Sequence, residues 1–330
     1  MTTAVKISYA LMVAFMLGII VFHMGHVLLA AMFSFLVMEA IFRAIRRRMR
    51  PAVARLIAAC GFVVAASAVI AIFAHFIAQT VKTFPSIVEN SMPQISAIAG
   101  RFGFSLPFEN FQDLREFLNG KLVSHAIDIT KASSLLTREV FHMVIAVFAA
   151  VFFFVSGKPP EYKQNLFDAV RKETNNRIRK FTYSFERIFG AQIIISSINT
   201  VLTITFLYIM AIPHLAFLSS MTFIIGIMPI IGNIITNTVI VFTALGISIN
   251  EAAIALLFLI AIHKLEYFLN SKIMGSSINI PMWQMLLAIL IGNVVMGISG
   301  IMLAPAFLHY IKSELQAIPW AFGKTEHQKA

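Results

Sequence analysis

The sequence predicts an all-α integral membrane protein with about eight transmembrane spans. Of its 330 residues, 59% are hydrophobic and only 12% are charged, and its mean hydropathy is +0.85. Soluble globular proteins contain about 45–50% apolar and about 25% charged residues. The apolar residues also form long runs, several of them near or above the ~17 residues that an α-helix needs to cross a bilayer.

The distribution of basic residues predicts the orientation of the chain. The formal net charge is +11, but the Lys and Arg residues cluster in loops beside apolar runs. This is the positive-inside pattern of membrane proteins and not a nucleic-acid-binding surface. Residues 43–55 hold six arginines and no acidic residue, and residues 156–187 hold eight Lys/Arg against four Asp/Glu. We therefore expect both segments and the N-terminus in the cytoplasm, beside anionic lipid.

The chain divides into three predicted parts. Residues 1–79 form N-terminal membrane helices, a short hairpin followed by a third span at 52–79. Residues 80–138 carry a nearly balanced charge of six Lys/Arg and five Asp/Glu, together with three prolines. This pattern favours an external segment of short amphipathic helices. Residues 139–330 form the C-terminal membrane core, which includes the cytoplasmic loop 156–187.

The stretch 214–249 is apolar throughout but is interrupted near its middle. The interruption combines three helix-breaking residues with two amides: Gly226, Pro229, Gly232, Asn233 and Asn237. Irregular backbone at membrane depth is tolerated only inside protein or beside water. Broken helices with free carbonyl and amide groups form the binding sites of many transporters. The alternative is a plain helical hairpin with a tight turn, because Gly and Pro are common in membrane helices.

Polar residues recur on one face of the predicted span 188–210. They lie at positions i, i+4, i+7 and i+11: Gln192, Ser196, Asn199 and Thr203. Polar groups in a membrane helix usually face the interior of the bundle. The stripe therefore lines a polar pathway or, as the alternative, hydrogen-bonds to neighbouring helices.

An ionisable cluster is predicted on the apolar helix 251–270. His263, Glu266 and Asn270 lie at i, i+3 and i+7, on one face. An ionisable residue inside a span is a functional-site hypothesis, and Glu266 is the candidate to carry a proton or to pair with a cation. The alternative is that this is the inner end of the helix, where charges lie at headgroup level.

The last apolar stretch, 283–311, contains a further set of small and polar residues. Asn293 stands among three glycines and a proline: Gly292, Gly297, Gly300 and Pro305. The stretch is either one tilted span or a hairpin that enters and leaves from the inside, and the small residues allow close approach of two helices.

Several chemistries are absent from the sequence. It contains no G-x-x-x-x-G-K-[ST] phosphate loop, no H-E-x-x-H zinc helix and no G-x-S-x-G elbow. Its single cysteine, Cys60, cannot form a disulfide or a cysteine metal site within one chain. We therefore expect no enzyme, no cofactor and no metal centre.

The C-terminal half resembles a known family, the autoinducer-2 exporter-like permeases. The resemblance rests on FERIFGAQ (185–192), GIMPIIGN (226–233), the helix containing Glu266, and ILIGNVVMGISGIMLAP (289–305). Family members usually carry a proline about five residues after the Glu266 position, where this chain has Ser271. The resemblance implies transport in a bacterial inner membrane, with autoinducer-2 export or sodium/proton antiport as the described activities. It also favours the hairpin at 283–311, which returns the C-terminus to the cytoplasm.

Together these features predict a secondary transporter or exporter of a small solute. The expected partners are that solute, a sodium ion or a proton, and membrane lipid, but no nucleic acid; a homo-oligomer is compatible with the sequence. The alternative is a non-transporting membrane scaffold or assembly protein. The predicted pathway comprises Gln192, Ser196, Asn199, Thr203, Pro229, Gly232, Asn233, Asn237, His263, Glu266, Asn270 and Asn293.

Overall fold

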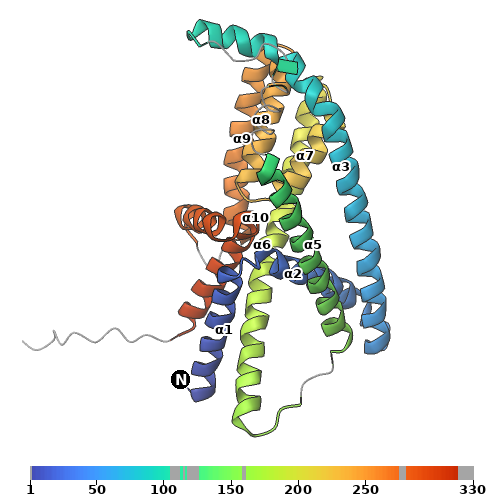
Figure 1. The fold of residues 1–330 in the computed structure, drawn as a ribbon, viewed down its shortest axis with the longest axis vertical. Coiled ribbons are helices and arrows are strands. Elements are labelled where there is room, and N and C mark those ends of the chain that lie inside the picture. The colour runs from blue at the N-terminus through green and yellow to red at the C-terminus, as the bar shows by residue number, and fades with distance from the viewer. Residues whose placement is uncertain are drawn as a thin grey trace, which may run out of the picture. The chain divides into compact units, whose positions relative to one another are not determined.

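The computed structural model describes residues 2–104, 112–113, 116, 126–157, 161–274 and 280–318. All regular elements within these residues are helices, which confirms the predicted all-α fold (Figure 1). The helices are α1 (Thr3–Val21), α2 (Gly25–Ile45), α3 (Pro51–Arg101), α5 (Ala126–Val155), α6 (Leu166–Ile209), α7 (Leu215–Gly226), α8 (Ile231–Leu245), α9 (Ile249–Met274) and α10 (Met282–Gln316).

Six helices in the described part of the chain are long and apolar enough to cross a membrane: α1, α2, α3, α5, α6 and α10. In contrast, α7 and α8 contain 12 and 15 residues. At about 1.5 Å per residue they reach only about 18 and 22 Å, less than the ~30 Å hydrocarbon core. The polytopic character is therefore confirmed, whereas the number of about eight spans stays a prediction.

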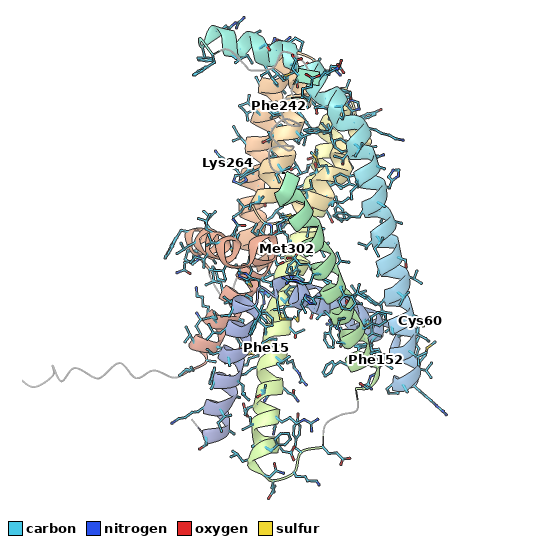
Figure 2. The ribbon with its side chains drawn as sticks, in the orientation of Figure 1. Phe15, Cys60, Phe152, Phe242, Lys264 and Met302 are labelled. Atoms are coloured by element: carbon cyan, nitrogen blue, oxygen red, sulfur yellow. The ribbon has the colours of Figure 1, made fainter. Side chains whose placement is uncertain are left out.

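The membrane-facing character of the helices is visible on their surfaces. Large apolar side chains are exposed along the spans, including Val64 at 70%, Phe152 at 72% and Val294 at 84%. Phe15 and Phe152 are labelled on α1 and α5 in Figure 2. Exposing so much apolar surface to water is unfavourable, so this surface is suited to contact with lipid.

The chain forms two compact units. The first contains Met1–His23, Tyr162–Ile188 and Met274–Ala330, and the second contains Met24–Glu161 and Phe189–Ile273. The three-part division expected from the sequence remains a prediction.

In the second unit α3 is longer than predicted. We expected a span at 52–79 followed by short helices, because Pro85 interrupts the pattern. Instead α3 continues without interruption through Pro85 and Pro93 to Arg101. An internal proline costs about 3 kcal/mol, but α3 packs here against α7 and α8 and buries Ile87 to 2% exposure. This packing offsets the free-energy cost of the prolines.

Residues 105–111 of the expected external segment lie outside the described residues.

α6 joins two predicted elements. We expected a surface helix within 156–187 and a separate span at 188–210, but one helix runs from Leu166 to Ile209. Its C-terminal part belongs to the second unit, where the rings of Phe206 and Phe258 stack with centroids 3.9 Å apart. This contact fixes α6 against α9.

The core of the second unit holds α7 and α8 in place. Leu218 of α7, Ile240 of α8 and Ala255 of α9 are completely buried in one cluster. Phe76 of α3 adds a stacked ring against Phe217 of α7, with centroids 6.0 Å apart. This apolar packing fixes the positions of α7 and α8 and therefore the position of the turn between them.

α10, in the first unit, is a hairpin, as favoured from the sequence. The backbone leaves helical geometry at Gly297, with φ 60° and ψ −141°. The two arms cross where Gly292 meets Gly300, and a Cβ at either position would collide with the carbonyl of the other. Two glycines therefore allow a backbone contact that no other residue permits.

Candidate functional site

The turn between α7 and α8 carries backbone strain. α7 ends at Gly226 and α8 begins at Ile231, and the two helices lie side by side in Figure 1. Ile230 has φ 64° and ψ −59°, a conformation that is an outlier for a β-branched residue. A Cβ at Gly232 would overlap the carbonyl of Ile225. The predicted interruption is thus also a tight hairpin, and strain of this kind concentrates at functional sites.

Two residues of the polar stripe on α6 support this turn. The Gln192 side chain donates a hydrogen bond from Nε2 to the carbonyl of Gly226 at 3.0 Å. The Ser196 hydroxyl donates to the carbonyl of Phe223 at 2.8 Å. The last carbonyls of a helix have no partner within the helix, so these side chains satisfy the end of α7. Gln192 and Ser196 therefore hydrogen-bond to a neighbouring helix and hold the turn in place. This is the alternative given above, in which the polar stripe bonds to neighbouring helices.

Further along the stripe, a buried carboxylate is surrounded by amides. The Asn233 side chain on α8 donates from Nδ2 to Oε2 of Glu266 on α9 at 2.5 Å. The Asn199 side chain on α6 also hydrogen-bonds to Glu266. All three side chains belong to buried residues: Asn199 is 4% exposed, Asn233 is 8% exposed and Glu266 is 7% exposed. We call them the carboxylate–amide centre.

The carboxylate–amide centre has an unused acceptor. Among the described residues, Oδ1 of Asn199 is buried without a hydrogen-bond partner. An unsatisfied buried polar group costs free energy, so a missing donor or a cation would stabilise this oxygen. Amide and carboxylate oxygens are the ligands that hard cations prefer, and a carboxylate can also take a proton. The centre can therefore bind a small cation or exchange a proton.

His263 connects this centre to the surface. Its Nδ1 lies 3.9 Å from Oε2 of Glu266, and its ring is 65% exposed whereas the glutamate side chain is 9% exposed. Lys264 is exposed and points away from α9 in Figure 2. One turn of α9 thus carries both the buried carboxylate and an exposed imidazole beside it.

The remaining predicted residues are dispersed. Thr203 is 2% exposed on α6, and Pro229 and Asn237 are half-buried at and beyond the turn. The Asn270 side chain lies outside the described part of the chain. Asn293 is exposed on α10 in the first unit. The structure therefore groups Gln192, Ser196, Asn199, Gly232, Asn233, His263 and Glu266, and it does not add Asn293 to them.

Within the described residues, no group of three or more His, Cys, Asp or Glu side chains could hold a metal ion. Any cation at the carboxylate–amide centre would therefore be bound by one carboxylate and by amide or backbone oxygens.

A second buried ionic site was not predicted from the sequence. Arg177 on α6 and Glu314 on α10 are 5% and 4% exposed in the first unit. Glu314 lies three residues beyond the apolar run 283–311, and Arg177 lies among seven other basic residues in 156–187. The only available signal was an isolated glutamate directly after an apolar run, which also describes an ordinary helix end.

Comparisons with known proteins agree with a role in transport. Residues 6–320 match the model of the family described as AI-2E family transporter. A 134-residue stretch is 32% identical to a Bacillus subtilis (strain 168) protein named "Putative transport protein YdbI". That match covers 39% of this chain and 38% of the relative. Because the family model spans nearly the whole chain, this protein belongs to the AI-2E transporter family.

Proposed function

We propose that this membrane transporter is a secondary exporter of a small polar solute, and that the carboxylate–amide centre couples export to a proton or a cation. The observation that carries the proposal is Glu266, a buried carboxylate held by amides from two other helices beside a strained break. Ionisable groups inside membrane helices are expensive to bury and mark ion pathways. The sequence also contains no phosphate loop with which to use ATP.

The resemblance to the autoinducer-2 exporter-like permeases supports autoinducer-2 or a similar signalling molecule as the exported solute, and the family match supports transport. Sodium/proton antiport is the second candidate, because the free Oδ1 of Asn199 beside a carboxylate suits a hard cation. Both candidates use the same acidic residue, and they differ in which species crosses the membrane.

Flux in proteoliposomes tests this proposal. Vesicles containing the protein and loaded with autoinducer-2 are expected to release it faster when a proton gradient is imposed, and a protonophore should remove the acceleration. A sodium pulse applied to vesicles containing a luminal pH dye tests antiport in the same preparation. Export that persists without any gradient and requires ATP would contradict secondary transport, and silence in both assays would favour the scaffold alternative.

The proposed topology has the N-terminus in the cytoplasm and the C-terminal end of α3 outside. Gly100 is exposed near that end, and a side chain there would meet nothing within 4 Å. After Cys60→Ser removes the single native thiol, Gly100→Cys is expected to react with a membrane-impermeant maleimide in intact cells. Ser156→Cys, which is exposed after α5, should react only after the cells are opened. The reverse pattern would invert the proposed topology.

A further inference from the structure

A second ionic cluster lies in the first unit and shares no residue with the carboxylate–amide centre. Glu314 of α10 accepts two hydrogen bonds at Oε2, one from Arg177 of α6 at 2.9 Å and one from the Tyr9 hydroxyl of α1 at 2.8 Å. Arg177 also donates from Nε to the Ser8 hydroxyl at 2.8 Å. Lys180 Nζ lies 3.1 Å from Oε1 of the same glutamate. We call these five residues the Glu314 cluster.

The Glu314 cluster fixes three separate parts of the sequence to one another. The Arg177 guanidinium lies 3.4 Å from the centroid of the Tyr9 ring, so it forms a cation–π contact with α1 as well as an ion pair with α10. Arg177 and Glu314 are nearly fully buried, whereas the Lys180 side chain is 48% exposed. One carboxylate therefore joins α1, α6 and α10, with one of its partners at the surface.

The position of Glu314 on α10 determines which part of the hairpin the cluster can hold. It lies near the end of the second hairpin arm, which runs from residue 298 to residue 316. Near the opposite end of that arm the backbone turns at Gly297, where a Cβ would meet no other atom within 4 Å. Gly297 itself thus makes no close contact, whereas the arm beyond it is packed at Gly300 and Leu303 and reaches the Glu314 cluster near its end.

Two further contacts hold the same hairpin. Near its tip the carbonyl of Val295 lies 2.9 Å from Nδ1 of His23, and along the second arm His309 Nδ1 lies 2.9 Å from the Ser184 hydroxyl. Neither contact involves a charged pair. Glu314 adds an ionic contact near the end of the arm.

We propose that the Glu314 cluster is an electrostatic latch that holds the second arm of the α10 hairpin against α1 and α6. A buried ion pair contributes little net stability over apolar packing, and its best-established use is to specify one arrangement of the chain. Removing Glu314 leaves the buried Arg177 without its ion-pair partner, and removing Arg177 leaves Glu314 with only the half-exposed Lys180 as a cationic partner in the cluster, so the arm would loosen. That the latch opens during transport is a consequence that rests on the proposed function.

Hydrogen–deuterium exchange on the full chain in lipid nanodiscs tests the latch without requiring a transported solute. Glu314→Gln is expected to speed exchange in residues 298–316 by about tenfold or more. Arg177→Gln should do the same, whereas Arg179→Gln, which removes the same charge from an exposed position of α6, should stay within about twofold of the parent. Tyr9→Phe, which removes one donor and keeps the ring, should give a smaller rise and serves if Glu314→Gln does not fold.

A charge exchange provides the rescue. Arg177→Glu combined with Glu314→Arg is expected to slow exchange relative to either single change, because the pair is restored in reverse. Unchanged exchange in Glu314→Gln, or a double variant no slower than the single ones, would overturn the latch. If the latch holds while the parent protein moves no solute or ion in proteoliposomes, the proposed function fails and the latch stands.

Discussion

Replacing Glu266 with glutamine is expected to abolish ion-coupled transport while leaving the protein folded and inserted. Glutamine has the same shape and can still accept the hydrogen bond from Asn233, but it cannot carry a proton or a negative charge. We expect gradient-driven flux to fall at least about tenfold and to lose its dependence on pH, as for other ionisable groups on membrane pathways. Flux measured across a series of pH values, in proteoliposomes with equal amounts of protein, gives the result.

Glu251 supplies the matched control on the same helix. It lies in the first turn of α9, outside the carboxylate–amide centre. Glu251→Gln removes one carboxylate from α9 and is expected to keep both the rate and the pH profile of the parent. If Glu266→Gln transports with an unchanged pH profile, Glu266 has no role in coupling. It is then a residue at the inner end of the helix, which was the alternative for this cluster.

Replacing Gly300 with valine is expected to cause the largest loss of stability. Any Cβ at this position would overlap the carbonyl, carbonyl carbon and Cα of Gly292. Because these are backbone atoms, no rotamer change relieves the clash, and the hairpin arms must separate. Overpacking of a side chain costs about 1–3 kcal/mol, so a clash with backbone should reach or exceed the upper end of that range. Thermal unfolding in detergent, with the yield of monodisperse protein, measures the effect.

Gly18 of α1 is the control for this substitution. It lies in a helix of the same unit, and a Cβ there would meet nothing within 4 Å. Gly18→Ala is expected to leave stability unchanged or to raise it by up to about 1 kcal/mol, because alanine favours helix more than glycine. A Gly300→Val protein as stable as the parent would show that the hairpin arms do not touch at this point.

Local chemistry made part of the fold predictable. The break in 214–249 was expected because glycine and proline permit backbone that other residues avoid, whereas the hairpin in 283–311 was favoured over a single span by the family resemblance. The same argument failed at Pro85, where packing of α3 on α7 and α8 outweighs the missing hydrogen bond. Local signals thus predict where a helix can break, and the surrounding contacts decide whether it does.

The candidate site was predictable only in part. Helical spacing placed Gln192 and Asn199 on one face, but it could not distinguish the side chain that braces the turn from the side chain that meets Glu266. The contact between Asn233 and Glu266 joins residues 33 positions apart on different helices, so no local pattern contains it. Glu314 was missed for the same reason, since its partner Arg177 is 137 positions away.

If the carboxylate–amide centre lies on an aqueous pathway, a charged thiol reagent should reach cysteines placed there from water. In a Cys60→Ser background, Asn199→Cys and Asn233→Cys are placed one at a time in membranes and treated with a small charged thiol reagent. Two controls should stay unreactive: Ile240→Cys, which is buried in the apolar core, and Leu257→Cys on the exposed apolar surface of α9, where we expect lipid rather than water.

We expect the cysteines at 199 and 233 to react with the charged reagent although both positions are buried in protein, because water and the solute reach them. Unreactive cysteines at both positions, beside a reactive Ser156→Cys after α5 in opened membranes, would show a dry, packed interior. That result would contradict the transport site and would leave the polar residues of α6 and α8 as contacts between helices.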